Sequence, residues 1–199
     1  MNIRTALAVL ALATGLALPA FAQETRSFTA ANGMFDIPVA PKRIVALNDQ
    51  IVALPLHELG APVVGSAGRT DAEGNHFLRG GMDTLGIDYA NTDISYIGGF
   101  NALDIEAVAA LSPDLIIGGL YTDADVAEQL QKVAPTLIID NNALGIIGTM
   151  RTFADIVGKS GDFEARLKRY QDNVARTRSF LDSPENISVS LTFVFPAGE

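Results

Sequence analysis

The chain has 199 residues, of which 14 are Lys or Arg and 23 are Asp or Glu, so its formal net charge is −9 at pH 7. This acidic balance, without a basic stripe, argues against nucleic acid and anionic membrane surfaces as partners. The chain has no cysteine, so no disulfide holds the fold.

The first 22 residues have the pattern of a secretory signal peptide. Arg4 supplies a basic start, an apolar core runs from about Ala6 to Leu18, and Ala20-Phe21-Ala22 matches the A-x-A cleavage site. The core is too short to cross a bilayer, although a membrane anchor or a buried helix is the alternative reading. We expect cleavage after Ala22 and release into the periplasm. No cysteine follows this site, so lipid attachment there is not expected.

The next segment predicts extended structure followed by two buried strands. Residues 23–41 form a lead-in with a possible hairpin at Asn32-Gly33, a turn dipeptide. Apolar runs at 43–47 and 62–65 predict the strands. Residues 70–93 are polar, glycine-rich and poorly periodic, so we expect a long functional loop with a short helix.

A helix is expected between these two strands. The apolar spacing from Ile51 to Leu59 is helical, and Gly60 follows it as a helix-ending residue. Pro55 lies inside this span and is expected to bend or shorten the helix, because proline has no backbone N–H.

Residues 103–140 carry the clearest fold signal, a succession of helix, strand, helix and strand. The first helix shows apolar residues at helical spacing, namely Ile105, Val108, Ala109 and Leu111. Continuous apolar runs at 115–117 and 136–139 predict buried strands. Between them, Thr122 with Asp125 resembles a capping box that opens a helix, and Pro135 ends it.

Strands buried on both faces and joined by single helices pair in parallel through right-handed crossovers. The predicted fold class is therefore α/β, a parallel sheet with helices on both faces. Small ligands usually bind in the loops after such strands. The fold class alone does not define the function.

From Gly145 onward the pattern changes to helix. One helix is expected to end at Gly158, and a second, long helix is expected from Asp162 to Leu181. Residues 187–195 then predict a new strand. It is either an edge strand of this lobe or the start of a further lobe, and we favour the further lobe. The predicted organisation is signal peptide 1–22, α/β lobe 23–144, linking helices 145–182 and start of a second lobe 183–199.

This order of elements resembles the periplasmic binding proteins of ABC importers for iron–siderophore complexes, haem and cobalamin. The segments that carry the resemblance are 41–47, 59–65, 105–117, 133–137 and 153–181. The resemblance implies two α/β lobes joined by a long helix, of which this chain matches the N-terminal lobe and the linking helix. It implies a monomer that binds a small-molecule iron chelate and delivers it to an inner-membrane ABC permease.

Within the family, residues 71–79 followed by 96–98 resemble the branch that carries catecholate siderophores. A ferric siderophore is then the transported ligand, and no cofactor is expected. A haem or cobalamin carrier of the same family is an alternative, and so is a single-lobe interaction module without ligand binding of its own.

The resemblance also suggests roles for particular residues. Glu106 occupies the family's position for docking on permease arginines, although a first-turn glutamate is also favoured by the helix dipole alone. Ligand contacts are expected in loops after strands, where arginine forks match anionic oxygens and aromatic rings stack on ligand rings. The predicted ligand-binding residues are Asn48, Arg69, Arg79, Phe100 and Tyr121.

Direct metal binding and catalysis are both disfavoured. The chain has two histidines, His57 on a predicted helix and His76 in a predicted loop, which is too few for a bare-metal site. There is no cysteine nucleophile, and residues 65–68 do not form a G-x-S-x-G elbow. The glycines at 118–119 lack the lysine of a P-loop. We expect a binding protein and not an enzyme.

Overall fold

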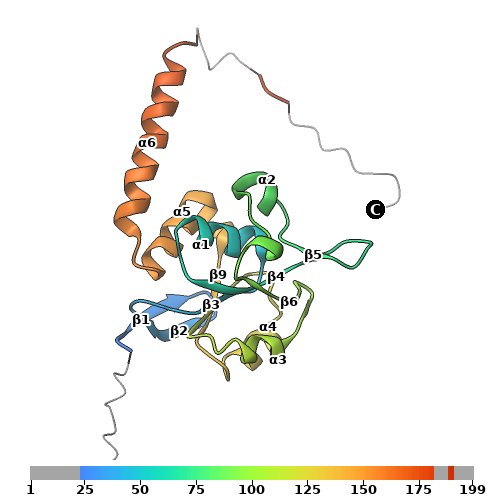
Figure 1. Ribbon diagram of the computed structural model, residues 1–199. Coiled ribbons are helices and arrows are strands. Elements are labelled where there is room, and N and C mark those ends of the chain that lie inside the picture. The colour runs from blue at the N-terminus through green and yellow to red at the C-terminus, as the bar shows by residue number, and fades with distance from the viewer. Residues whose placement is uncertain (1–22, 182–187, 191–199) are drawn as a thin grey trace, which may run out of the picture.

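The computed structural model describes residues 23–181 and 188–190 (Figure 1). The strands are β1 (Thr25–Ala30), β2 (Gly33–Pro38), β3 (Ile44–Ala46), β4 (Val63–Thr70), β5 (His76–Phe77), β6 (Ser95–Gly99), β7 (Ala102–Leu103), β8 (Leu115–Gly119) and β9 (Thr136–Ile139). The helices are α1 (Leu54–Glu58), α2 (Gly81–Leu85), α3 (Ile105–Ala110), α4 (Ala124–Leu130), α5 (Asn141–Ile156) and α6 (Ser160–Arg178). A π-helical turn, η1 (Asp49–Ala53), and a 3₁₀ turn, η2 (Tyr89–Asn91), complete the order. The predicted signal peptide and most of the strand predicted at 187–195 lie outside the described residues.

The main sheet has the strand order β7-β6-β4-β3-β8-β9, and β5 pairs with β4. The β6, β4, β3, β8 and β9 strands are parallel, while β7 and β5 each pair antiparallel with a neighbour. The predicted α/β class with a parallel sheet is thus confirmed.

Helices cover both faces of this sheet, as predicted (Figure 1). On one face α1, α5 and the start of α6 pack against Ile44, Leu115 and Leu137. On the other face α3 and α4 pack against Val45 and Ile116. Neighbouring residues of one strand therefore point into different cores, which explains why the strands read as continuous apolar runs.

The hairpin predicted at Asn32-Gly33 is confirmed, because β1 and β2 pair antiparallel around this turn. The Asn32 side chain continues the main sheet in place of another strand. Its Nδ2 donates to the Thr136 carbonyl at 2.9 Å, and its Oδ1 accepts from the Ile138 N–H at 2.9 Å. The turn thus covers the open edge of β9, which would otherwise present unpaired backbone groups.

The strand predicted at residues 62–65 is longer than expected, since β4 continues to Thr70. Small residues at 65–68 hid this strand from a reading based on apolar runs. Gly68 is small for a packing reason, because a Cβ there would clash with the Tyr89 hydroxyl. The segment 70–93 contains the expected short helix, α2, but it also contains β5 and η2, which were not predicted. The strands β6 and β7 were not predicted either.

The helix expected at 51–59 begins as the π-helical turn η1 and continues as the α-helix α1. Pro55 is the second residue of α1, directly after the π-helical turn, and Gly60 ends the helix at φ 73°. The predicted capping box of α4 is wrong. Asp123, not Thr122, is the N-cap, and its carboxylate accepts from the backbone N–H of Asp125 at 2.8 Å.

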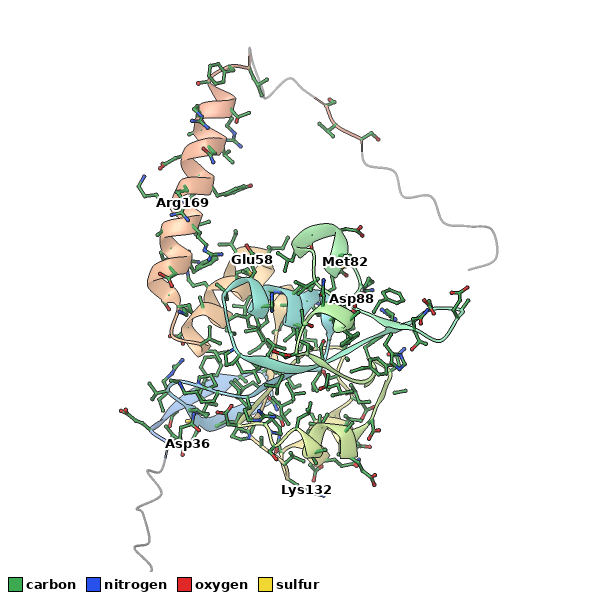
Figure 2. The ribbon with its side chains drawn as sticks, in the orientation of Figure 1. Asp36, Glu58, Met82, Asp88, Lys132 and Arg169 are labelled. Carbon is green, nitrogen blue, oxygen red and sulfur yellow. The ribbon has the colours of Figure 1, made fainter. Side chains whose placement is uncertain are left out.

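The helix α5 is interrupted at Gly145, whose backbone is at φ 63° and ψ 179°. The following turns bury Phe153 and Ile156 in the core. The predicted long helix is α6, and its first half packs on the core, with Phe163 and Leu167 buried and Tyr170 61% exposed. The rest of α6, including Arg169, extends away from the sheet layers (Figure 2). No helix in residues 23–181 and 188–190 combines the length and apolar character needed to span a membrane.

Candidate functional site

Three predicted ligand residues meet at the carboxyl edge of the sheet. Asn48 follows β3, Phe100 follows β6 and Tyr121 follows β8, and parallel strands end at a common edge. The three side chains line one shallow hollow, which we call the edge hollow. Its lining residues are Leu47, Asn48, Ile51, Phe100, Gly119, Tyr121 and Thr122.

The hollow combines aromatic surface with free hydrogen-bonding groups. Tyr121 is 69% exposed, so its ring is open to a ligand. The Asn48 Oδ1 accepts from the Ile51 N–H at 3.0 Å and thereby caps η1. This bond engages Oδ1 and leaves the Nδ2 group of Asn48 as the donor that a ligand can use. The same side chain therefore fixes the π-helical turn and offers a contact.

Arg69 joins this group from the side. It lies within β4 near its end, and not in a loop after the strand as predicted. Its guanidinium carbon is 4.2 Å from the centroid of the Phe100 ring. No carboxylate among the residues that the structure describes forms an ion pair with Arg69. Its positive charge is therefore held by stacking and remains available to an anion.

Arg79 is placed differently from the other predicted ligand residues. Its Nη2 lies 3.5 Å from the Asp49 Oδ1, and its backbone N–H donates to the Asp49 Oδ2 at 2.9 Å. Asp49 is only 2% exposed, so Arg79 supplies the counter-charge of a buried carboxylate. Arg79 does not line the edge hollow, and a ligand contact by this residue stays a prediction.

Glu106 lies in the first turn of α3, on the side of the sheet opposite to α1. The N-cap of this helix is Asp104, whose Oδ1 accepts from the Ala107 N–H at 3.0 Å. Glu106 itself is exposed, and no ion pair links it to a cation within the described ranges. It is thus open to a partner, and its docking role stays a prediction.

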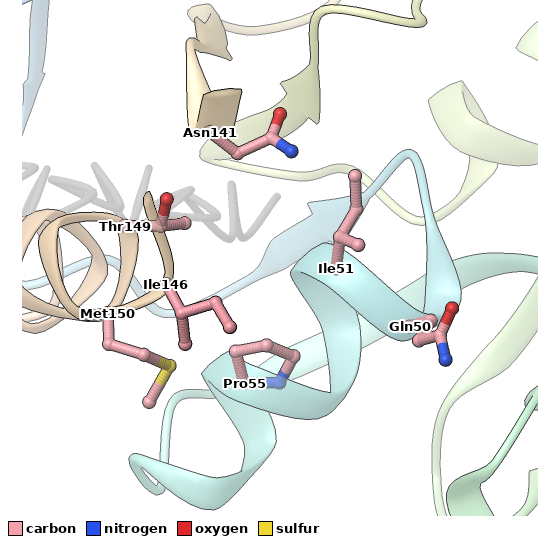
Figure 3. Close-up of a pocket in the computed structure, with 7 residues that line it drawn as sticks. All are labelled: Gln50, Ile51, Pro55, Asn141, Ile146, Thr149 and Met150. Carbon is pink, nitrogen blue, oxygen red and sulfur yellow. The ribbon is translucent and has the colours of Figure 1, made fainter. Parts of the chain in front are cut away.

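A second hollow, between η1, α1 and α5, was not predicted. We call it the α5 hollow (Figure 3). Its lining residues are Gln50, Ile51, Pro55, Asn141, Ile146, Thr149 and Met150. Ile51 lines both hollows, so they adjoin at η1. The position of Asn141 shortly after the predicted strand β9 could have indicated this hollow from the sequence, because other site residues also follow strands.

An aromatic cluster is formed by residues of β5, η2 and β6. The ring of His76 stacks on Tyr96 with 3.7 Å between centroids, and Tyr89 meets Tyr96 edge-on. The Tyr89 hydroxyl donates to the Ser66 carbonyl at 2.9 Å, and burial raises the pKa of this phenol. His76, predicted in a loop, is in a short strand. Residues 23–181 and 188–190 contain no group of three or more His, Cys, Asp or Glu placed to hold a metal ion.

Comparison with known proteins defines the class to which this lobe belongs. A family model described as "Periplasmic binding protein" matches residues 84–196, which is more than half of the chain. The iron(3+)-hydroxamate-binding protein FhuD of Bacillus subtilis (strain 168) is 28% identical over 159 residues, covering 78% of this chain and 45% of that protein. The chain therefore belongs to the periplasmic binding protein family.

Solved structures give the same result. The Staphylococcus aureus SirA structure with staphyloferrin B aligns at a TM-score of 0.60 and 28% identity, covering 76% of this chain and 48% of that chain. Unliganded FhuD2 from S. aureus aligns at 0.60 and 30% identity, covering 77% and 50%. The chain spans about half the length of these relatives. The fold expected from the resemblance, including the long C-terminal helix, is confirmed.

Proposed function

We propose that this protein is the periplasmic substrate-binding component of an ABC importer and that it binds a ferric siderophore. The observation that carries the proposal is the convergence of Asn48, Phe100 and Tyr121 on one hollow, with the Arg69 guanidinium beside it. Aromatic faces, an amide donor and an unpaired cation suit a chelate with rings and anionic oxygens. No enzymatic step is part of this proposal.

The printed names of the relatives support the ligand class. They include hydroxamate binding for FhuD of B. subtilis and ferric dicitrate binding for FecB of Escherichia coli (strain K12). Within this class we propose a catecholate as the favoured ligand, because the Arg69–Phe100 pair offers both a charge and a ring. Competing hydroxamate and citrate ligands are the direct comparison.

The remaining expectations belong to the same proposal. Residues 1–22 are a cleaved signal peptide that sends the protein to the periplasm, and 145–182 connect the lobe 23–144 to a second lobe that starts at 183. Arg79 is a further ligand contact. Glu106 docks the loaded protein on the permease, and the protein works as a monomer.

The test is a titration of the purified protein with ferric catecholate, ferric hydroxamate, ferric dicitrate, haem and cobalamin. The chain has no tryptophan, so quenching of its four tyrosines is the readout. Tyr121→Ala is expected to weaken binding by about tenfold, which is of the order that loss of one ring contact brings. The matched control is Tyr170→Ala, since this tyrosine is similarly exposed but lies on α6, away from the edge hollow.

Saturable binding of a ferric siderophore, weakened by Tyr121→Ala and not by Tyr170→Ala, supports the proposal. Saturable binding of haem or cobalamin instead would name another ligand of the same family. A folded protein that binds none of the five ligands contradicts the proposal, and a single-lobe interaction module would then explain the fold.

A further inference from the structure

The end of β4 and the short strand β5 form an arm that projects from the sheet layers (Figure 1). We call residues 69–78 the β4–β5 arm. Its turn is closed by Asp71, whose Oδ1 accepts from the backbone N–H groups of Glu73 at 3.0 Å and Asn75 at 2.7 Å. These bonds give the turn a defined geometry, so the two strands of the arm are held in register.

One face of the arm holds it against the rest of the lobe. The ring of His76 stacks on Tyr96 of β6 with 3.7 Å between centroids, and the Thr70 Oγ1 lies 3.0 Å from the His76 Nδ1. Leu78, two residues after His76, is 2% exposed and belongs to the core. Because side chains alternate between the two faces of a strand, Phe77 points to the opposite face of the arm.

The opposite face brings Phe77 to Arg69. The two residues are direct partners in the antiparallel register of β4 and β5, and the Cβ atoms of such a pair lie about 4.5–5.5 Å apart on one face. The Arg69 guanidinium in turn lies over the ring of Phe100, which lines the edge hollow. Two residues after Phe77, the Arg79 N–H donates to Asp49, the first residue of η1. The arm thus returns to the lobe beside the edge hollow.

Packing within the lobe does not account for the Phe77 ring. In residues 23–181 and 188–190, this ring is half-buried and packs against neither of the two hydrophobic cores. No carboxylate in the same ranges neutralises the Arg69 guanidinium beside it. A planar aromatic anion fits this pair, because its ring can stack on Phe77 while its oxygens accept from Arg69. An aliphatic anion would use the charge alone.

We propose that Phe77 is a specificity-determining residue of the binding site, which selects chelates whose iron-binding groups are aromatic rings. The Phe77 ring stacks on one ring of the chelate, and Arg69 binds the oxygen atoms that this ring carries. His76 and Tyr96 are positioning residues, because they hold β5 from the face that the ligand does not contact. The inference rests on the proposed siderophore binding, and the selection of an aromatic ring can be tested without iron.

The first experiment uses benzoate, a planar aromatic anion, as the probe. It is titrated into ¹⁵N-labelled protein while the backbone amide signals are followed, and saturable shifts are expected at Arg69, Phe77 and Phe100. The matched probe is cyclohexanecarboxylate, which has the same charge and a saturated ring. It is expected to bind about fivefold more weakly, which is of the order that loss of one aromatic pair brings. Equal affinities for the two probes, or no shifts at these three residues, would overturn the selection of a ring.

The second experiment compares the affinities for two anionic chelates, a hexadentate ferric tricatecholate and ferric dicitrate, which has no aromatic ring. Phe77→Leu leaves all four tyrosines in place, so tyrosine quenching still reports binding. This change is expected to weaken the tricatecholate by about fivefold and ferric dicitrate by about twofold or less. Phe77→Tyr keeps the ring and is expected to retain the affinity for the tricatecholate. The matched control is Phe28→Leu, at a half-buried position on β1 beyond the β9 edge of the sheet, and it should change neither affinity.

Urea unfolding shows that each variant compared is folded. If Phe77→Leu binds the tricatecholate as tightly as the wild type, or weakens both chelates equally, the specificity role is overturned while siderophore binding stands. If the wild type prefers benzoate to cyclohexanecarboxylate but binds no ferric chelate, the proposed function fails and the arm remains a site for aromatic anions. The benzoate comparison uses the wild type alone, so it decides the question even if Phe77→Leu does not fold.

Discussion

The guanidinium of Arg69, on β4, stacks on the ring of Phe100, which follows β6, with 4.2 Å between the guanidinium carbon and the ring centroid. A cation–π contact fixes the position of an arginine without cancelling its charge, unlike an ion pair. Phe100 also lines the edge hollow together with Asn48 and Tyr121. The stack therefore presents an unneutralised positive charge beside the aromatic surface of the candidate site.

The first prediction concerns this charge. Arg69→Gln is expected to weaken the binding of a trianionic ferric tricatecholate by more than tenfold, because a charged hydrogen bond and its Coulomb attraction are both lost. The loss for an uncharged ferric trihydroxamate is expected to be threefold or less. Titrations of both chelates at two salt concentrations measure the difference. Equal losses for the two chelates would contradict a role for the Arg69 charge.

The second prediction concerns Asp49, which is 2% exposed and accepts hydrogen bonds from the backbone N–H groups of Gln50 and Arg79. Asp49→Ala is expected to lower the free energy of unfolding by about 3 kcal/mol, since it removes both acceptors and the counter-charge of Arg79. Urea unfolding measures this. Asp49→Asn, which keeps the shape and one acceptor oxygen, should cost clearly less, and an equal loss for the two variants would show that the remaining acceptor oxygen and the packing contribute nothing.

The third prediction concerns the effect of the Thr149 hydroxyl on the stability of the folded protein. Thr149→Val removes a buried hydroxyl that has no partner and keeps the shape of the side chain. The free energy of unfolding is expected to rise by about 1 kcal/mol, because an unsatisfied polar group is no longer buried. Thr152→Val, at a half-buried position one turn later on α5, is the control and should change stability little. A marked destabilisation by Thr149→Val would mean that its hydroxyl is satisfied in the folded protein.

The elements predicted best from the sequence are those whose local residue pattern directly reflects their burial or their turn geometry. The strands β8 and β9 read as apolar runs because both of their faces are covered, and the hairpin at Asn32-Gly33 follows from turn chemistry. The strand β4 was half missed because Gly65, Ser66 and Gly68 give it no apolar signature. Their small size serves tertiary contacts, such as that of Gly68 with the Tyr89 ring.

The candidate site was predictable only as far as the carboxyl-edge rule applies. That rule led to Asn48 and Tyr121, which follow the predicted strands β3 and β8, and the structure places Phe100 beside them after β6, a strand that was not predicted. It gave no information on the pairing of Arg79 with Asp49, since these residues are 30 positions apart in the sequence. The α5 hollow was equally hidden, because it depends on how η1 and α5 pack against each other.

The fourth prediction concerns the acid stability of the α5–α6 contact. The Arg151 Nε donates to the Glu164 Oε1 at 2.6 Å, and this bond lowers the pKa of Glu164 below its ordinary value of 4.5. The stabilisation is therefore fully present above the ordinary pKa and is lost as the pH falls through the lowered one.

Glu164→Gln should reduce the difference in urea midpoint between pH 7 and pH 3, with the larger effect at pH 7. The control is Asp172→Asn, which removes an exposed carboxylate that pairs with Lys168 on the same helix. If Glu164→Gln lowers the midpoint equally at both pH values, the Glu164 charge does not contribute to the α5–α6 contact.

The fifth prediction concerns Glu106, which is exposed in the first turn of α3. A rim carboxylate that meets a basic patch contributes mainly to orientation and association rate. Glu106→Arg is therefore expected to slow association of the loaded protein with the ABC permease at least tenfold. The affinity for the ferric chelate should be unchanged, because Glu106 does not line the edge hollow.

Association with the permease reconstituted in nanodiscs measures the docking step, and tyrosine quenching measures chelate affinity in the same preparation. The matched control is Glu128→Arg, which makes the same charge change at an exposed site on α4, next to α3 on the same face of the sheet. Equal slowing by both variants would mean that the net charge of the lobe governs the encounter. A specific docking contact requires that only Glu106→Arg slows association. The slowing should be larger at low salt, because exposed charge pairs are screened over about 10 Å at 0.1 M salt.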